Sequence, residues 1–402
     1  MLRGQNDAPL LLDVSRLIWR RWSGTRATGI DRICLAWLKH YASRAQAVVV
    51  HRRLTAILPE HTSRALFRLL LRTEDPGSDT LRFRLDLLRL GLRHAAHLRD
   101  RLPGRGRVWL NPGHTGLDLA GLSDWCRQRD ILPVYLVHDL IPITHPQFCR
   151  DGEEQRHRQR MLTILESAQG LVANSHHTLA SFMTFAHQED AKMVPAVVAW
   201  PGVSRLPVVA SSHGSQEPTF VVLGTIEGRK NHKLLLEVWK DLLVAGRAST
   251  APVPKLVIVG RRGWQAEDVF AALDKHDFQG KVEEVGPLDD ERLAVVLGSA
   301  RALLFPSLAE GFGIPLIEAL SAGVPVIASD LDVFREIGQG VPELLPASDA
   351  EQWRQAILDY ARPVSPRRAQ QLGRMSGFVP PSWEDHFKAV DRLIAGLEPR
   401  GQ

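Results

Sequence analysis

The sequence is poor in cysteine and tyrosine, with three of each among 402 residues. Its cysteines, Cys34, Cys126 and Cys149, lie far apart, and none belongs to a C-x-x-C pair. An odd number of cysteines without paired spacing argues against a disulfide framework and against a zinc knuckle. We therefore expect a protein of a reducing compartment and predict a cytoplasmic location.

Long apolar runs are lacking as well. No stretch of eighteen or more apolar residues occurs, so the sequence predicts no membrane-spanning helix. Residues 1–7 also lack the apolar stretch of a secretory signal. Any membrane contact is therefore expected to be peripheral, on the inner face of the plasma membrane.

Charge of either sign is moderate. Charged residues make up 24% of the chain, the formal net charge is +5, and 44% of the residues are apolar. This composition is ordinary for a globular protein, and 402 residues favour two domains over one. The small positive excess fits anionic partners such as phosphate esters or anionic lipid.

The positive charge concentrates in residues 61–107, which hold eleven arginines, no lysine and five acidic residues. Leucines recur there at helical spacing, as in Leu81, Leu85, Leu88 and Leu92. An Arg-rich amphipathic helix can lie on an anionic membrane surface. The alternative is a solvated helix whose leucines pack on its own domain. Because the arginines alternate with leucines and not with exposed aromatics, we expect no nucleic-acid partner.

Apolar segments of strand length alternate with segments of helical spacing in both halves of the chain. The first half has such strands at residues 10–15, 48–50, 108–112, 132–137, 170–174 and 197–202, and the second at 220–223, 256–260, 282–285, 302–306 and 324–328. This alternation predicts an α/β protein with two doubly wound, Rossmann-like domains facing across a cleft. A polar linker at residues 204–218 separates the predicted domains, 1–204 and 205–377.

The most informative segment is residues 310–318, which read EGFGIPLIE. Glu310 and Glu318 lie eight residues apart, with two glycines and a proline between them. The segment follows one predicted strand and leads through a helix to the next, which makes a βαβ unit. Glycines let backbone N–H groups approach a ligand closely, and a helix N-terminus binds anions. The sequence therefore predicts a ligand site at the carboxyl ends of the second domain's strands.

Four strings, at residues 221–231, 258–260, 305–313 and 318–326, occur in an order that resembles the retaining glycosyltransferases of family 4. The first half resembles this family over fewer residues, at TGIDR (28–32) and VHDLIP (137–142). The resemblance implies the GT-B fold and a hexosyltransferase that needs neither a cofactor nor a metal ion. In this family the last helix crosses back to the N-terminal domain, so residues from about 378 to 402 are assigned there.

The resemblance also implies roles for the side chains of the second half. Lys230 would neutralise the departing diphosphate, with Arg229 supplying the guanidinium that the family usually carries at the position of Thr225. Glu318 would accept hydrogen bonds from the ribose hydroxyls, and Glu310 would lie near the donor sugar and the reacting centre. For Lys230 and Arg229, the alternative is a solvated basic turn.

Further positions complete the predicted site. His138 follows a strand and would contact the donor sugar, although a lone histidine is more often structural. The catalytic prediction is therefore Glu310, His138 and Lys230. The donor-binding prediction lists Gly29, Gly224, Thr225, Arg229, Lys230, Phe312, Gly313, Ile314 and Glu318. Asp330 and Asp332 form a D-x-D pattern, but the GT-B fold does not use it, so no metal site is predicted.

GDP-mannose is the favoured donor, on the similarity around residues 225–227 and 28–32, with UDP-linked sugars left open. The predicted acceptor is a lipid-linked or polysaccharide chain of a bacterial surface polysaccharide such as lipopolysaccharide. Two alternatives remain. One is a sugar-nucleotide epimerase of the same fold. The other is a non-catalytic, sugar-nucleotide-binding subunit of a polysaccharide assembly complex, which Thr225 keeps open.

Overall fold

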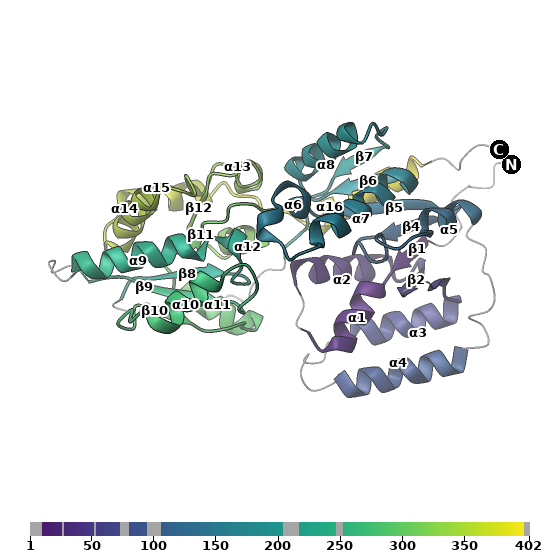
Figure 1. Cartoon of the computed structure of the whole chain (residues 1–402), viewed down its shortest axis with the longest axis horizontal. Coiled ribbons are helices and arrows are strands. Elements are labelled where there is room, and N and C mark those ends of the chain that lie inside the picture. The colour runs from purple at the N-terminus through teal and green to yellow at the C-terminus, as the bar shows by residue number, and fades with distance from the viewer. Residues whose placement is uncertain are drawn as a thin grey trace. The chain divides into compact units, whose positions relative to one another are not determined.

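The computed structural model describes residues 10–25, 28–51, 54–72, 80–94, 106–203, 217–246 and 252–397. Most of the predicted linker at 204–218 and parts of the basic segment 61–107 therefore lie outside the described residues. Contacts divide the chain into two compact units. The first comprises Met1–His138, Gln155–Pro201 and Trp383–Gln402, and the second comprises Asp139–Glu154 and Gly202–Ser382 (Figure 1).

The first unit is built on a seven-stranded sheet in the order β3-β2-β1-β4-β5-β6-β7. The strands are β1 (Leu10–Asp13), β2 (Ala45–His51), β3 (Leu54–Ile57), β4 (Val108–Asn111), β5 (Leu132–Val137), β6 (Gly170–Ala173) and β7 (Ala196–Val198). All neighbours pair in parallel except β2 and β3, which form an antiparallel pair at the edge. The edge strand β3 was not predicted, because its four residues are short and only partly buried.

Helices cover both faces of this sheet. They are α1 (Ser15–Ser23), α2 (Gly29–Tyr41), α3 (Glu60–Leu71), α4 (Thr80–His94), α5 (Leu122–Gln128), α7 (Glu153–Ser167), α8 (His176–Gln188) and α16 (Trp383–Ala395). The last helix, α16, packs on α2, where Trp37 donates from its indole nitrogen to His386 Nε2 at 2.9 Å. The C-terminal helix is thus an integral part of the first unit's core.

The second unit has a six-stranded sheet, all parallel, in the order β10-β9-β8-β11-β12-β13. Its strands are β8 (Thr219–Leu223), β9 (Lys255–Val259), β10 (Val282–Glu284), β11 (Ala302–Phe305), β12 (Val326–Ser329) and β13 (Glu343–Leu345). The order reverses between β8 and β11, and ligands of open α/β sheets bind at such a point, at the carboxyl ends of the strands. The α/β, doubly wound character predicted for both halves is confirmed.

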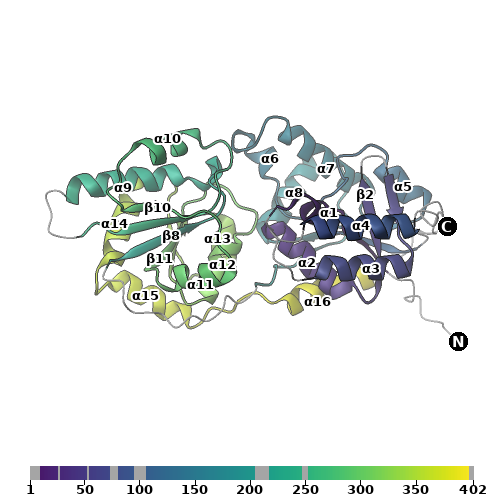
Figure 2. The same ribbon diagram turned by 90° about the horizontal axis from the view of Figure 1, so that it is seen from below.

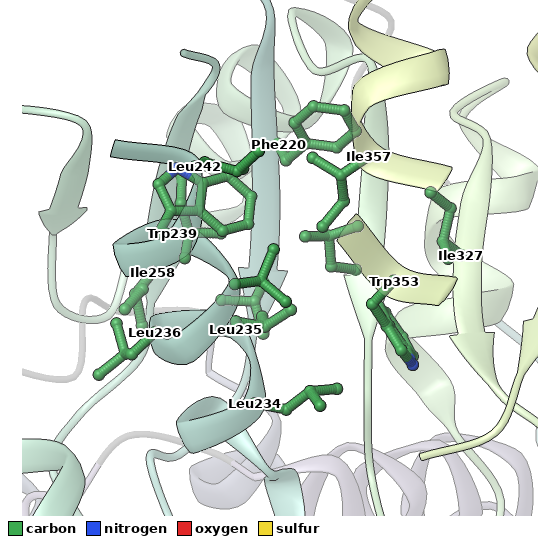
Figure 3. Packing of buried hydrophobic residues seen from close by; sticks show 14 of the residues in the cluster. Phe220, Leu234, Leu235, Leu236, Trp239, Leu242, Ile258, Ile327, Trp353 and Ile357 are labelled. Carbon is green, nitrogen blue, oxygen red and sulfur yellow. The ribbon is translucent and has the colours of Figure 1, made fainter. Parts of the chain in front are cut away.

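The helical segments of the second unit are α6 (Ile141–Thr144), η2 (Pro146–Phe148), η3 (Gly228–Lys230), α9 (His232–Gly246), α10 (Glu267–Lys275), α11 (Asp290–Gly298), α12 (Ile314–Ser321), α13 (Asp332–Gly338), α14 (Ala350–Ala361) and α15 (Pro366–Met375). Trp239 of α9 and Trp353 of α14 pack with Phe220 of β8 in one continuous apolar cluster (Figure 3). This cluster holds α9 and α14 on the sheet and thereby fixes the turn between β8 and α9. None of the helices that the structure describes combines the length and apolar character needed to cross a bilayer.

Candidate functional site

Two loops meet at the point where the order of the second sheet reverses. One runs from Gly224 at the end of β8 to Lys230 in η3, and the other runs from Pro306 after β11 to Gly313. They are joined by a backbone hydrogen bond, from the Leu308 N–H to the Arg229 carbonyl at 2.7 Å. Because β8 and β11 are neighbouring parallel strands, residues far apart in sequence come into contact here.

Glu310 is the centre of this contact. Its Oε1 accepts hydrogen bonds from Lys230 Nζ, from Arg229 Nη1 at 2.8 Å and from Ser307 Oγ at 2.9 Å. Glu310 and Lys230 are both buried. Burial by itself would raise the pKa of Glu310, but Arg229 and Lys230 outweigh it and lower that pKa to about 2. The carboxylate is therefore ionised at neutral pH.

A second buried carboxylate, Glu227, completes the cluster. Its Oε1 lies 2.7 Å from Arg229 Nε, while Arg229 Nη1 also donates to the Ala309 carbonyl at 3.0 Å. Burial raises the pKa of Glu227, and the opposing effects of Arg229 and Lys230 do not cancel the rise. Two cations thus face two carboxylates, and we call these four residues the buried charge cluster: Glu227, Arg229, Lys230 and Glu310.

Lys230 is held from several sides. Its Nζ lies 4.7 Å from the centre of the Phe305 ring, a cation–π distance. Gly224 has a positive φ of 128°, and a Cβ added there would lie 3.8 Å from Lys230 Nζ. Burial lowers the pKa of Lys230, and Glu310 opposes the effect. His232, the first residue of α9, is buried beside it, and burial together with Lys230 lowers the pKa of His232 to about 3.

The predicted anion-binding turn leads into α12. Gly313 is the residue before the helix and has a φ of 103°, and a Cβ at this position would come within 2.8 Å of Phe334. Only glycine fits both the conformation and the space. Phe312 and Gly313 precede the helix and Ile314 is its first residue, as predicted, and Glu318 is buried in the second turn.

Thr225, which stands where the family usually carries an arginine, lies in a tightly packed turn. A Cβ on Gly263 would come within 2.6 Å of Thr225 Cγ2, and one on Gly260 would overlap the Gly224 carbonyl. Ile226 also pairs with Arg262 as an isolated bridge. The Thr225 side chain is therefore directed at the turn after β9, and Arg229 is the residue that brings a guanidinium to Glu310.

Residues 139–154 group with the second unit, although the predicted boundary placed them in the first domain. The indole of Trp264 donates to the Phe148 carbonyl at 3.2 Å, and the Arg150 guanidinium lies 4.5 Å from the centre of the same indole. A Cβ on Gly228 would contact Phe148 at 3.5 Å, so the segment packs directly on η3. The chain leaves the first sheet after β5 and covers the loop that carries Arg229.

The other two predicted site residues belong to the first unit. His138 is buried at the end of β5, and its Nε2 lies 2.7 Å from the Pro112 carbonyl. Because a carbonyl only accepts, Nε2 of His138 carries a proton. Gly29, which was predicted to bind the donor, is the first residue of α2, since Thr28 and Asp31 form a capping box that starts the helix there.

The structure thus brings Lys230, Arg229 and Glu310 into direct contact and places Gly224 beneath Lys230. Sequence reasoning missed Glu227, although its position two residues before Arg229 offered a signal. Asp330 of the D-x-D pattern instead accepts a hydrogen bond from Arg335 at 2.5 Å. The buried charge cluster can bind an anion through its cations if that anion displaces a carboxylate.

Comparison with known proteins gives a consistent result for the second half. Residues 208–361 match the family described as glycosyl transferases group 1. The serotype-specific mannosyltransferase WbdA of Escherichia coli is 27% identical over 243 residues, covering 56% of this chain and 29% of that protein. The O-antigen chain mannosyltransferase B of Escherichia coli is 31% identical over 207 residues, covering 50% of this chain and 53% of that protein. The matched regions therefore span about a third to a half of these relatives.

Solved structures share the fold along nearly the whole chain. HepE of Anabaena, solved in complex with UDP, has a TM-score of 0.62 and 15% identity, covering 96% of this chain and 99% of that one. WaaG, a glycosyltransferase involved in lipopolysaccharide biosynthesis, has a TM-score of 0.59 and 16% identity, covering 96% and 100%. At such identity the likeness shows the fold alone, and it confirms the GT-B prediction.

Proposed function

We propose that this chain, whose residues 208–361 form a glycosyl transferases group 1 domain, moves a hexose from a nucleotide sugar to a carbohydrate acceptor. The observation that carries the proposal is the buried charge cluster at the reversal point of the second sheet, next to the N-terminus of α12. Transfer from a sugar nucleotide releases a diphosphate, whose growing charge must be stabilised. Arg229, Lys230 and the N–H groups at the start of α12 are the groups that would do so.

In the buried charge cluster, Lys230 can exchange its partner Glu310 for the diphosphate when the donor binds. Before the donor binds, Lys230 and Arg229 share the same oxygen of Glu310. A diphosphate carries more negative charge than one carboxylate, so it would draw Lys230 away from Glu310. The freed carboxylate oxygen would then face the donor sugar, where it could orient a hydroxyl or stabilise developing positive charge. Glu318 would hold the ribose hydroxyls.

The finer parts of the proposal rest on resemblance and on the names of relatives. Retention requires the acceptor hydroxyl to reach the anomeric carbon on the face of the leaving diphosphate. Mannose from GDP-mannose is favoured because the matched proteins WbdA and mannosyltransferase B are mannosyltransferases. A lipid-linked or polysaccharide acceptor is favoured because one of them is named for O-antigen chains. We propose that no metal takes part. The roles of His138 and Gly29 and the cytoplasmic location stay predictions.

A non-catalytic subunit that binds sugar nucleotides is the second candidate. Thr225 favours it, because the usual arginine is missing at that position and Arg229, the nearby guanidinium, is already paired with Glu227 and Glu310. The ion pair between Lys230 and Glu310 favours catalysis, since a binding protein needs the cation but has no need of a carboxylate beside the sugar.

The test is a binding and hydrolysis screen in EDTA with GDP-mannose, UDP-glucose, UDP-galactose and UDP-GlcNAc. We expect one donor to bind and to be hydrolysed slowly by the wild type, and Lys230→Ala to lose both properties. Lys233→Ala is the matched control, because Lys233 lies three residues further on, is exposed, and pairs with the exposed Asp268 at 3.3 Å. Binding without turnover, even with acceptors from a membrane extract, would favour the non-catalytic candidate. Equal binding by wild type and Lys230→Ala would overturn the site.

A further inference from the structure

Two histidines of the first unit follow neighbouring strands and connect the ends of those strands. His114 comes three residues after β4, and its Nε2 lies 2.7 Å from the Leu136 carbonyl of β5. His138 comes directly after β5, and its Nε2 lies 2.7 Å from the carbonyl of Pro112, the residue after β4. Because a carbonyl only accepts, each Nε2 carries a proton. The two rings thus link β4 and β5 in both directions, and we call this pair of hydrogen bonds the histidine clasp.

The turn that carries His114 is held tightly. The buried Asn111 accepts from the Gly113 N–H at 3.2 Å and donates to the Thr115 carbonyl at 3.1 Å. A Cβ on Gly113 would come within 3.1 Å of the Arg16 side chain. His114 itself has a φ of 57°, a left-handed conformation that is uncommon outside glycine. Such a conformation persists only where the surrounding structure determines it, and it is found most often at functional sites.

The backbone of His138 is held as well. Its carbonyl accepts hydrogen bonds from Asn174 Nδ2 at 2.8 Å and from Thr178 Oγ1 at 3.3 Å. Asn174 follows β6 and Thr178 lies in α8, so both are fixed by regular structure. The orientation of the His138 ring therefore depends on where the Pro112 carbonyl lies. That carbonyl belongs to the turn that His114 ties to β5.

His114 is suited to this contact because it is neutral. Its ring centre lies 5.0 Å from that of His138 and 6.0 Å from that of His157, which belongs to α7 of the same unit (Figures 1 and 2). Burial lowers the pKa of His114 well below its usual value, and the two other imidazoles and Arg160 lower it further. A neutral ring can donate from Nε2 to the Leu136 carbonyl without bringing a charge into the interior.

We propose that His114 is a positioning residue, which holds the ring of His138 in one orientation and one tautomer through the turn that carries Pro112. His138 is the residue of the first unit that is predicted to contact the donor sugar. A ring fixed before the donor arrives loses no further freedom on binding and meets the sugar in a defined geometry. The inference rests on the proposed function only for this contact with the sugar, since the arrangement of the two rings can be measured without a donor.

The direct test is nitrogen-15 NMR of the full chain, labelled on histidine. The signals of His138 are those that are missing from the spectrum of His138→Gln. In the wild type we expect the shifts of a single tautomer with its proton on Nε2. In His114→Asn we expect shifts averaged over both tautomers, because the Pro112 carbonyl is no longer tied to β5. Asparagine is the chosen replacement because it is among the residues that adopt the left-handed conformation most readily.

Donor hydrolysis supplies the second measurement. His114→Asn should lower kcat about tenfold and leave the affinity for GDP or UDP within about twofold, because the buried charge cluster belongs to the second unit. The double variant with His138→Gln should be no slower than His138→Gln alone, since His114 acts through His138. Two independent roles would instead multiply the two losses.

His114→Gln tests for rescue. Glutamine keeps an N–H donor on the side chain, and it already adopts the same backbone conformation at Gln265, Gln279 and Gln339 of this chain. If it donates to the Leu136 carbonyl in place of the imidazole, it should restore the single tautomer of His138 and much of kcat.

Tyr135→Phe is the matched control for a general loss of stability. Tyr135 precedes Leu136 in β5, and its hydroxyl lies 2.8 Å from Ser167 Oγ in the interior. The variant loses one buried hydrogen bond of the same strand without removing either bond of the histidine clasp. It should lower the melting temperature, as His114→Asn does, and leave the tautomer of His138 and kcat unchanged.

Three results would overturn the inference. The first is a wild type whose His138 already shows averaged shifts. The second is His138 keeping its wild-type shifts in His114→Asn, and the third is an equal loss of kcat in His114→Asn and Tyr135→Phe. If the wild type hydrolyses no donor, the transfer proposal fails, while the NMR comparison still decides the role of His114.

Discussion

Two arginines of the second unit make the same kind of contact in different surroundings. Arg229 lies between Glu227 and Glu310 in the buried charge cluster, and Arg262 lies between Asp274 and Glu284 on the surface. Geometry does not distinguish them, because each guanidinium has two carboxylate partners at hydrogen-bond distance. Burial does distinguish them, because water screens the charges of Arg262 and its partners but not those of Arg229 and its partners. A close ion pair indicates a site only where removing one partner would leave a charge stranded in the interior.

The largest effect is expected from Glu310→Ala. The substitution removes the carboxylate that Lys230 and Arg229 share in a buried position, and breaking such a pair costs about 3–5 kcal/mol of stability. Donor hydrolysis should fall by about a hundredfold or more. Thermal unfolding and single-turnover hydrolysis measure the two losses. Glu310→Gln should recover much of the stability without recovering the activity, and full activity of the glutamine variant would contradict the role of the charge.

To test whether burial makes the difference between the two arginines, the effects of Arg229→Ala and Arg262→Ala should be compared. Removing Arg229 strands Glu227 in the interior and deprives the donor site of a cation. The melting temperature should therefore fall by several degrees, and KM for the donor should rise about tenfold. Removing Arg262 should change neither quantity measurably, because its partners stay in water. Equal effects of the two substitutions would show that burial is not the deciding difference.

The acid stability of the protein should reflect Glu310. Its pKa is about 2 in the folded chain and near 4.5 in the unfolded one, so the unfolded chain binds more protons between these values. The stabilisation is complete above about pH 4.5 and is lost as the pH falls toward 2, by roughly 3 kcal/mol. Denaturant unfolding at a series of pH values measures this loss. Glu310→Gln should flatten the curve in that window, and an unchanged curve would contradict the assignment.

The smallest expected effect is a gain of stability and not a loss. His232 is buried beside Lys230, and among the described residues neither of its ring nitrogens has a hydrogen-bond partner. An unsatisfied buried polar group costs about 1–3 kcal/mol, so His232→Leu, which is similar in volume, should raise the stability by about 1 kcal/mol. Thermal unfolding tests this prediction. A loss of stability would show that the imidazole has a partner, such as an ordered water.

Periodicity predicted most of the fold, because apolar runs of strand length alternate with helical spacing in both halves. The strands at the sheet edges were harder. Glu343–Leu345 is three residues long and partly exposed, so it carries no apolar run to detect. The grouping of residues 139–154 with the second unit was not predictable either, since contacts of Phe148 with Trp264 and Gly228 form across more than seventy residues of chain.

In the candidate site, too, the residues of one short segment were predictable from the sequence, and the contacts between distant segments were not. Glu310, Glu318 and Gly313 lie in one short segment, so their spacing alone predicted a ligand-binding turn. Glu227 was missed because its importance comes from Arg229, which bridges it to Glu310 across two loops. Such a bridge forms because β8 and β11 are neighbours, and local sequence does not predict the order of strands in a sheet.

The most direct test of the central claim is the affinity for a nucleoside diphosphate in EDTA, measured by titration calorimetry. GDP and UDP should be compared on the wild type, Lys230→Ala and Lys233→Ala. The account predicts that at least one diphosphate binds the wild type and Lys233→Ala alike, and binds Lys230→Ala about tenfold or more weakly. If the wild type and Lys230→Ala bind both diphosphates equally well, the buried charge cluster is not the donor site.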